Sequence, residues 1–394
     1  MRRAPRGFTL IEVMVSAGIL MVILAAVTSV LISINNSTQQ TNRVADLQDN
    51  ARTALAVLAS DLRSAGLGAS NGTVGIAPEG KWAARLPTVF SGPPTTFRDP
   101  NNNTYTVRSL YILGAEPPTL GITGTGDGMV GAITDPSNAK LRCTTYAGVQ
   151  YNCEKSMVGA DGYEHSVAYA PTGSPATFPY LLVHDQQRAS LVTPTGLSGP
   201  DGNGVQTLTF KEAGSLISPD PAAPFGFAQG FQVAKARVVH WYLLQTDPAA
   251  PPRLFRSRPT LVDQSGSCAL PFLDETSTGT VKGTEMGAGP IEDMEIRFIF
   301  DSNLTDDPTQ FVRTDNIDPC DPNAMTLMRQ LREIRIQLVS IGTSKMTNLS
   351  QSGTVARFTT PGFDGSSAST STDAYPRRAF VTRIAPRNVI PYRL

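Results

Sequence analysis

The segment Gly7-Phe8-Thr9-Leu10-Ile11-Glu12 opens an apolar run that extends to Ile34, and this run determines how the rest of the chain is organised. Three arginines lie immediately before it, at Arg2, Arg3 and Arg6. No charged residue occurs from Val13 to Asn42. The 22 residues of 13–34 would form a helix roughly 33 Å long at about 1.5 Å per residue, which is enough to cross the hydrocarbon core of a bilayer.

Glu12 distinguishes this run from a plain membrane anchor or a secretory signal. The basic leader is short and ends at Gly7, before the apolar residues begin. A carboxylate near membrane depth costs about 2.5 kcal/mol or more at a helix centre, and less toward an interface. Glu12 therefore needs a partner or a specific role.

The segment 6–12 resembles the processing site of type IV pilins and of the pseudopilins of type II secretion. The resemblance implies that a prepilin peptidase cleaves between Gly7 and Phe8, and that the new N-terminus at Phe8 is N-methylated. It also implies that Glu12 is the fifth residue of the mature chain, a position at which these families carry glutamate. An ordinary N-terminal anchor with this sequence is the alternative.

Cleavage would supply a candidate partner for Glu12. A free α-amine at Phe8 is normally protonated near neutral pH. It would lie within about a turn of Glu12 and, in a bundle of axially offset helices, near Glu12 of a neighbouring subunit. Such a pair would be strong in a low-dielectric bundle, where an unpaired carboxylate is costly. We therefore expect Glu12 to set the axial register between subunits.

One continuous helix is predicted from Phe8 to about Ala65. Its first half, 8–34, is the membrane or filament-core segment, and its second half, 35–66, is amphipathic because apolar residues recur at spacings of three and four. This stripe consists of Val44, Leu47, Ala51, Leu55, Leu58, Leu62 and Ala65. We expect the stripe to pack on a sheet, with Asp61 and the other charged residues around it; a coiled-coil partner is the alternative.

Glycines mark the predicted end of the helix at Gly66 and Gly68, because glycine adopts the left-handed conformation that closes a helix. The segment 60–66 just before it resembles the helix end of the large minor pilins called PilW, in which a phrase of the type D-[LI]-R-x-A-G is frequent. The closing segment, 375–388, also resembles the C-terminal strand of PilW-type proteins.

Strands with one buried face are predicted in the second half of the chain, where apolar and polar residues alternate. The alternation covers Met294–Phe300, Ile334–Leu338 and Phe380–Ile384, and Val233–Leu244 is a longer strand candidate. The apolar stripe of the helix is the natural cover for that face. The predicted fold is α+β and pilin-like: a long N-terminal α-helix packed on an antiparallel β-sheet, with large loop-rich insertions.

Residues 67–228 give weaker signals within a globular domain expected to span 67–394. The strand candidates are Thr104–Leu113, Tyr180–Val183 and Val205–Phe210. The stretches 91–103, 117–135 and 193–204 are rich in glycine, proline, serine and asparagine and are predicted to be loops. An inserted lobe at about 115–200 is the alternative to simple loops within one domain.

Four cysteines favour disulfides in a domain that we expect to be exported. They are Cys143, Cys153, Cys268 and Cys320. Of the three ways to pair them, we expect the two local pairs, Cys143–Cys153 and Cys268–Cys320. Free buried thiols are the alternative.

No catalytic, cofactor or metal site is predicted. The three histidines, His165, His184 and His240, are far apart, and no zinc-type spacing of His or Cys occurs. We expect His240 to be packed in a strand beside Trp241 or to lie at the surface. The acidic loops 301–307 and 315–321 offer oxygen ligands for calcium but lack the twelve-residue loop pattern, so solvated turns are expected. Acidic and basic side chains balance at 33 each, which gives no indication of nucleic-acid binding.

The resemblance implies a non-enzymatic minor pilin of the PilW type, made as a single-pass inner-membrane precursor with a periplasmic C-terminal domain. Its expected partners are the prepilin peptidase, other minor pilins, the major pilin, a large tip adhesin and the inner-membrane assembly platform. We expect it to prime assembly at the pilus tip and to support motility and adhesion. The alternatives are a GspJ-like minor pseudopilin, a membrane-tethered periplasmic enzyme, and a tethered adhesin that binds surfaces through residues 70–230.

Overall fold

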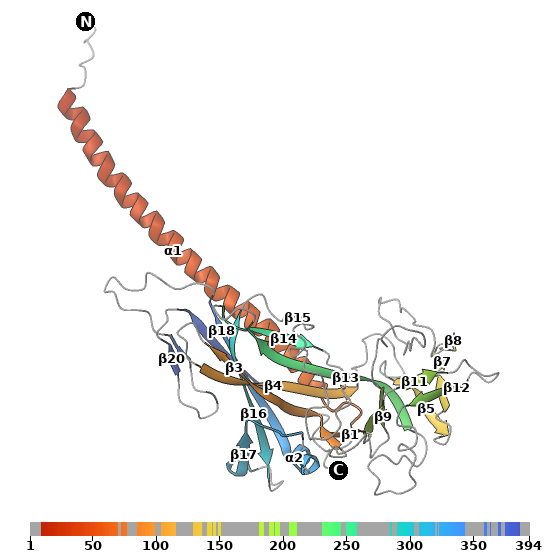
Figure 1. Cartoon of the computed structure of the whole chain (residues 1–394). Coiled ribbons are helices and arrows are strands. Elements are labelled where there is room, and N and C mark those ends of the chain that lie inside the picture. The colour runs from red at the N-terminus through yellow and green to blue at the C-terminus, as the bar shows by residue number, and fades with distance from the viewer. Residues whose placement is uncertain are drawn as a thin grey trace.

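The computed structural model of the chain shows a long helix that projects from a β-rich domain (Figure 1). It describes residues 9–69, 72–76, 85–98, 104–115, 129–135, 140–143, 145–146, 149–150, 181–184, 189–192, 194–197, 205–210, 231–245, 250–257, 284–285, 290–302, 307–319, 321, 323–342, 358–360, 363, 369–371 and 375–386.

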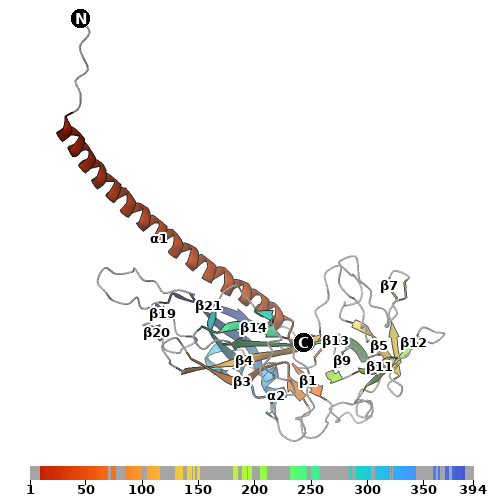
Figure 2. The same ribbon diagram turned by 45° about the horizontal axis from the view of Figure 1, so that its top comes forward.

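Helix α1 (Leu10–Arg63) is unbroken over 54 residues, as the sequence predicted. The helix stands clear of the domain over its N-terminal half and enters it over its C-terminal half (Figures 1 and 2). It ends at Ser64, and Gly66 and Gly68 follow with φ of 71° and 73°. These left-handed values are favourable only for residues without a Cβ, so the predicted stop signal is confirmed.

A sheet of thirteen described strands forms one side of the domain. The strands near the helix are β1 (Thr73–Ile76), β2 (Arg85–Pro87), β3 (Val89–Arg98), β4 (Thr104–Ala115), β13 (Phe231–Leu244), β14 (Arg253–Ser257) and β15 (Thr284–Glu285). Farther from the helix are β5 (Met129–Asp135), β6 (Lys140–Cys143), β9 (Leu181–His184), β10 (Ala189–Val192), β11 (Pro194–Leu197) and β12 (Val205–Phe210) (Figure 1). The first half of β13 pairs with β5 and β9, and its second half pairs with β4 and β14, so this one strand links the two groups.

A second sheet has four described strands in the order β17-β16-β18-β21. Their bounds are β16 (Ile291–Asp301), β17 (Phe311–Thr314), β18 (Leu331–Ile341) and β21 (Arg377–Ile384). The short helices η2 (Pro308–Gln310) and α2 (Ala324–Gln330) connect them, and two small ribbons are formed by β7 (Thr145–Tyr146) with β8 (Val149–Gln150) and by β19 (Phe358–Thr360) with β20 (Ser369–Ser371). All strand pairs of the second sheet are antiparallel, as the alternation predicted.

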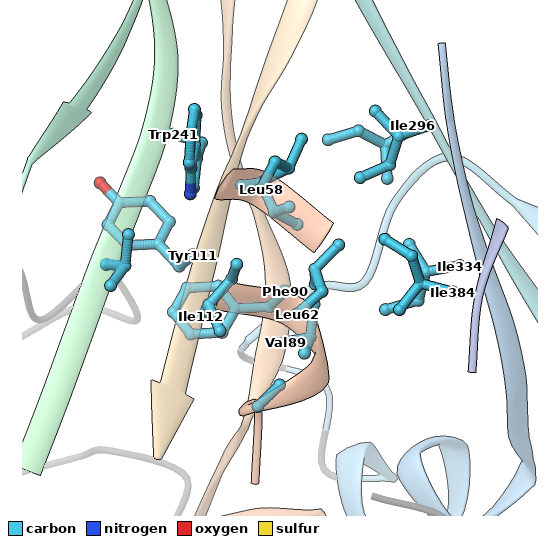
Figure 3. Packing of buried hydrophobic residues seen from close by; sticks show 14 of the residues in the cluster. Leu58, Leu62, Val89, Phe90, Tyr111, Ile112, Trp241, Ile296, Ile334 and Ile384 are labelled. Carbon is cyan, nitrogen blue, oxygen red and sulfur yellow. The ribbon is translucent and has the colours of Figure 1, made fainter. Parts of the chain in front are cut away.

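The C-terminal half of α1 lies between these two sheets (Figure 3). Leu58 and Leu62 are fully buried, with Trp241 and Ile112 of the first sheet on one side and Ile334 of the second sheet on the other (Figure 3). Replacing a buried leucine of this kind by alanine typically costs about 2–5 kcal/mol of stability. The predicted stripe is therefore confirmed as core from Leu47 onward, but two sheets cover it where the sequence indicated one.

A row of stacked aromatic rings lies on the face of the first sheet that points away from α1. Phe90 of β3 stacks on Tyr111 of β4, whose ring centroid lies 4.0 Å from that of His240 in β13. His240 stacks in turn on Tyr242, and Tyr242 on Phe255 of β14. Residues that alternate along a strand point to opposite faces, so Ile112 and Trp241 face the helix while Tyr111 and His240 face away.

The chain just after α1 is joined to β4 by backbone hydrogen bonds. The Gly66 amide donates to the Leu113 carbonyl at 2.9 Å, and the Ala115 amide donates to the Leu67 carbonyl at 2.7 Å. Gly114 lies between them, and a Cβ at this position would be 2.9 Å from the carbonyl oxygen of Ser64. Only a residue without a side chain permits this close approach of helix end and strand.

Three stretches predicted to be loops contain strands, so those predictions are wrong. β3 occupies much of 91–103, β5 the end of 117–135, and β11 part of 193–204. Gly92-Pro93-Pro94 hides β3 in the sequence, because a register shift between Ser91 and Pro94 accommodates residues that normally break a strand. The β1–β10 pair is parallel, which is a further departure from the all-antiparallel expectation.

Candidate functional site

The first candidate site is the exposed apolar half of α1. The most apolar 18-residue window within Leu10–Gln39 has a mean hydropathy of 2.6, and none of that window is buried in the chain itself. Thirty helical residues are about 45 Å long, which exceeds the roughly 30 Å hydrocarbon core of a bilayer. An apolar surface of this size requires lipid or other protein helices around it.

Glu12 takes part in a capping box at the N-terminus of α1. Its Oε2 accepts hydrogen bonds from the Thr9 amide at 2.9 Å and from Thr9 Oγ1 at 3.0 Å. The Glu12 amide donates back to Thr9 Oγ1 at 3.3 Å. The box satisfies backbone groups that a helix start otherwise leaves open. The partner predicted for Glu12 is an α-amine, of its own chain or of a neighbouring subunit. The local partner Thr9 was missed, although the T-x-x-E spacing is readable in the sequence.

The predicted cleavage point lies outside the described residues, since these begin at Thr9. Cleavage between Gly7 and Phe8 and methylation of Phe8 stay predictions. Both members of the capping box follow that point, so the box is compatible with a processed chain. Pairing of Glu12 with an α-amine also stays a prediction.

Asp61 is the hub of the second candidate site, deep in the domain. Its carboxylate is 2% exposed, and Oδ2 accepts from Trp241 Nε1 at 2.9 Å and from Arg256 Nε at 2.7 Å. Oδ1 accepts from Arg256 Nη2 at 3.2 Å and from Arg237 Nη2. Arg237 Nη1 also donates to Ser64 Oγ at 3.4 Å, and that hydroxyl donates to the Asp61 carbonyl at 2.8 Å. We call these five residues the Asp61 node.

The register of the first sheet explains how the node assembles. Arg237 and Trp241 are four residues apart on β13, so both side chains point to the face that α1 covers. Arg256 lies directly opposite Trp241 on β14. Burial lowers the pKa of the Arg256 guanidinium, but an arginine remains charged inside a protein. One carboxylate of the helix is thus held by two cations and an indole of the sheet.

The expectation that Asp61 would lie outside the buried stripe is wrong. Asp61 precedes Leu62 and faces the first sheet. Its charge can be buried there because it is paired with Arg237 and Arg256 rather than solvated. The signal that pointed to it was the D-L-R phrase near the helix end. Its three partners come from positions 237–256, and no local pattern in the sequence connects those positions with residue 61.

The structure also describes His240 and parts of the two acidic loops that the sequence singled out. His240 is buried in β13 and stacked between Tyr111 and Tyr242, which confirms the packed alternative. In the acidic loops, Asp301 is buried against Arg332 Nη2 at 3.2 Å, and Asp307 caps η2. Among the described residues, no group of three or more His, Cys, Asp or Glu could hold a metal ion.

The pentapeptide 68–72 has the Gly-x-Ser-x-Gly spacing of a serine nucleophile. It follows helix α1 and precedes strand β1, however, whereas such a nucleophile sits on a strand-to-helix turn. The spacing therefore gives no support to hydrolase chemistry here.

The cysteine pairing stays a prediction. Cys153, Cys268 and Cys320 lie outside the described residues, and of Cys143 only the backbone, at the end of β6, is described.

Two family models match the chain. The model of the prokaryotic N-terminal methylation motif matches residues 2–28, and the model of Type IV Pilus-assembly protein W, PilW, matches residues 241–388. The N-terminal segment is thus similar to type IV pilins, and the C-terminal region is similar to the PilW family. The PilW match contains Trp241 and Arg256 of the Asp61 node and the whole second sheet, so it extends far beyond the closing segment 375–388, for which the sequence alone indicated a resemblance.

Other comparisons add little to the family matches. No curated protein matches this pilin-like chain. Among solved structures, a type IV-like pilin from Thermus thermophilus is 8% identical, with 88% of this chain and 97% of that chain covered and a TM-score of 0.31. A TM-score this low does not by itself establish a shared fold. The α+β architecture rests on the long apolar helix and the antiparallel sheets that pack on it.

Proposed function

We propose that this chain is a minor pilin of the type IV pilus, which acts in a tip complex that initiates pilus assembly and supports motility and adhesion. The observation that carries the proposal is the apolar span Leu10–Gln39, which is unburied in the chain and continues without a break into the helix held between the two sheets. Such a helix inserts among the helices of other subunits while the domain stays outside. The N-terminal methylation motif and the PilW match support the same machine.

A position at the tip is supported by how much of α1 the domain covers. The domain buries one side of the helix from Leu47 to Ala65, with residues of both sheets in the same core from Ala51 onward, and leaves one mainly polar stripe open. The stripe consists of Asp49, Arg52, Ala56, Ser60 and Arg63, all exposed. A domain of this size, repeated along a shaft, would crowd its neighbours, whereas a tip subunit needs neighbours on one side only.

The proposed partners are the prepilin peptidase, the inner-membrane assembly platform, the major pilin, other minor pilins and a large tip adhesin. The proposed route runs from a single-pass inner-membrane precursor, with the domain in the periplasm, to the pilus tip at the cell surface. The role is structural: α1 supplies helix-to-helix packing and Glu12 the axial register. No catalytic step is proposed.

The test is intact-mass measurement and N-terminal sequencing of the protein from sheared, purified pili. The control is the same fraction from a strain that lacks the major pilin. We expect a small amount of chain that begins at methylated Phe8 and is present only with pili. A chain that still begins at Met1, or a processed chain that is absent from the pili of piliated cells, would contradict the proposal and favour a secretion pseudopilin or a tethered periplasmic protein.

A further inference from the structure

A cavity of about 390 Å³ lies between β4 and β16, and none of its lining residues comes from α1. This volume is within the range of about 300–1,000 Å³ typical of ligand sites. Its walls come from β3, β4, β16 and the turn after β17. The lining residues are Pro94, Thr106, Val107, Arg108, Asp293, Met294, Glu295, Ile296, Arg297 and Asp315. Five consecutive residues of β16 border the cavity, which we call the β16 groove.

The groove follows an open edge of the second sheet. On one side β16 pairs with β18 from Ile291 to Phe300. On the other side β17 pairs only with Phe298–Asp301, so among the described strands none pairs with 291–297 on that side. Alternate amide and carbonyl groups of such an edge point away from the sheet and can accept an added strand. The five residues 293–297 span about 17 Å of extended chain.

Two carboxylates in the groove differ from three other buried or half-buried acids that the structure describes. Asp61, Asp301 and Glu292 are each paired with arginine, Glu292 by two hydrogen bonds from Arg377. Asp293 and Glu295, two residues apart on one face of β16, form no ion pair with any described residue. Oε2 of Glu295 is buried and accepts no hydrogen bond from the described part of the chain.

Electrostatics show that these acids are costly to keep charged. Burial, together with Glu295 and Glu292, raises the pKa of Asp293 to about 7, although the Met294 amide donates to its carboxylate. Burial also raises the pKa of Glu295, while the charge of Arg297 opposes that shift. Of the other charged groups in the lining, Arg108 is basic and Asp315 acidic, so acids outnumber bases by three to two. Perturbed carboxyls in a cavity are typical of functional sites.

We propose that the β16 groove docks an extended segment of another protein subunit, which adds to the open edge of β16 and places a lysine or arginine side chain against Asp293 and Glu295. The open edge favours a peptide over a small molecule, because a strand satisfies the outward backbone groups along its whole length. The two unpaired carboxylates favour a basic side chain over an acidic or apolar one. A bound metal ion fits less well, because no described cluster offers three ligands.

The test measures binding of labelled six-residue peptides to the full chain in detergent micelles, by fluorescence anisotropy. The peptides alternate threonine and valine and carry Lys, Glu or Ala at the third position. A fourth peptide is the Lys form with alternate backbone nitrogens methylated, which prevents strand addition. We expect the Lys peptide to bind with a Kd below about 1 mM, and the other three at least tenfold more weakly.

Variants of the chain localise the binding. Glu295→Gln and Asp293→Asn each remove one negative charge. Each should raise the Kd of the Lys peptide by roughly tenfold, an effect between those of losing an exposed and a buried ion pair. Thr106→Trp fills the groove without a change of charge and should abolish binding. Asp49→Asn, at an exposed position on α1, is the matched control and should bind normally.

Three results would overturn the inference. The first is a Kd of the Lys peptide above about 1 mM, which corresponds to a binding free energy weaker than about 4 kcal/mol. The second is equal binding of the Lys and Glu peptides or of the methylated form. The third is unchanged binding to Thr106→Trp or Glu295→Gln. None of these results bears on the proposed pilus role, which is tested by processing and presence in pili.

Discussion

The indole nitrogen of Trp241 donates a hydrogen bond of 2.9 Å to the carboxylate of Asp61, across 180 positions of sequence. This contact connects α1 to β13, the strand that also carries the pairs to β5 and β9. The helix that we propose enters the filament is therefore bound, through one buried acid, to the strand that links both parts of the first sheet. A load passed along α1 would reach the domain through this contact, the apolar packing around it and the backbone hydrogen bonds between the helix end and β4.

Replacing Asp61 by asparagine or alanine should destabilise the domain strongly. Either change removes the buried carboxylate that the half-buried guanidinium groups of Arg237 and Arg256 bind, and breaking a buried ion pair from one side costs about 3–5 kcal/mol. Urea unfolding of the full chain in detergent, followed by Trp fluorescence, measures the loss. Asp49→Asn removes an exposed charge of the same helix and should change stability by less than about 0.5 kcal/mol. A loss at Asp61 no larger than at Asp49 would refute a structural role for the node.

Gly114→Ala should loosen the joint between the helix end and β4. The added Cβ would be 2.9 Å from the Ser64 carbonyl oxygen and 3.2 Å from the amide nitrogens of Gly66 and Leu67. All three are backbone atoms that cannot rotate away, so a cost of roughly 1–3 kcal/mol is expected in the same unfolding measurement. Gly18→Ala is the control, because a Cβ there meets nothing within 4 Å. Equal stability of the two variants would show that the backbone shifts without cost.

The sequence was most informative where structure is local. The apolar run, the stripe from Leu47 to Ala65 and the glycines after it depend on spacings of three and four, and all are found in α1 or directly after it. The alternation in β16, β18 and β21 likewise predicted which side chains face the helix. These patterns can be read from the sequence because each depends only on the spacing of residues within one helix or one strand.

Long-range pairing set the limit of sequence reasoning. Asp61 was expected only among the charged residues around the apolar stripe. Its burial was not predicted, because its three partners lie in β13 and β14 and only the register brings them together. The open edge of β16 depends on where β17 stops pairing, which no periodicity reveals. β3 was missed because a shift in its pairing with β4 allows glycine and prolines within a strand.

Asp293→Asn should stabilise the chain at pH 8 and have little effect at pH 4. The pKa of Asp293 is about 7 in the fold and near 3.8 when unfolded, so between these values the folded state binds the extra proton. Stability from this group is therefore present below pH 4 and is lost as pH rises through 7. A neutral amide avoids the loss, which we expect to be roughly 2–4 kcal/mol at pH 8.

The measurement is urea unfolding of the parent chain and of Asp293→Asn at pH 4, 6 and 8. The difference between them should grow with pH, since burial and then the charges of Glu295 and Glu292 disfavour the ionised carboxylate of Asp293 in the fold. Asp49→Asn should show no such trend. A variant that is less stable than the parent at pH 8 would mean that the carboxylate is already neutralised in the fold. Stabilisation together with weaker binding of the Lys peptide would show that the acid is kept for docking.

Three substitutions at the start of α1 separate the two roles of Glu12. Glu12→Gln keeps a side chain that completes a capping box but removes the charge, whereas Glu12→Ala removes both. Thr9→Ala keeps the charge and removes the hydroxyl that bonds it, at a cost of about 0.5–2 kcal/mol to the helix start. If the carboxylate pairs with an amine of a neighbouring subunit, both Glu12 variants should fail to enter pili, and Thr9→Ala should enter them nearly normally. Immunoblots of sheared pili and of membranes give the assembled and inserted amounts. Normal entry of Glu12→Gln, with loss of Thr9→Ala, would instead assign Glu12 to local capping and leave the axial register to the apolar face of α1.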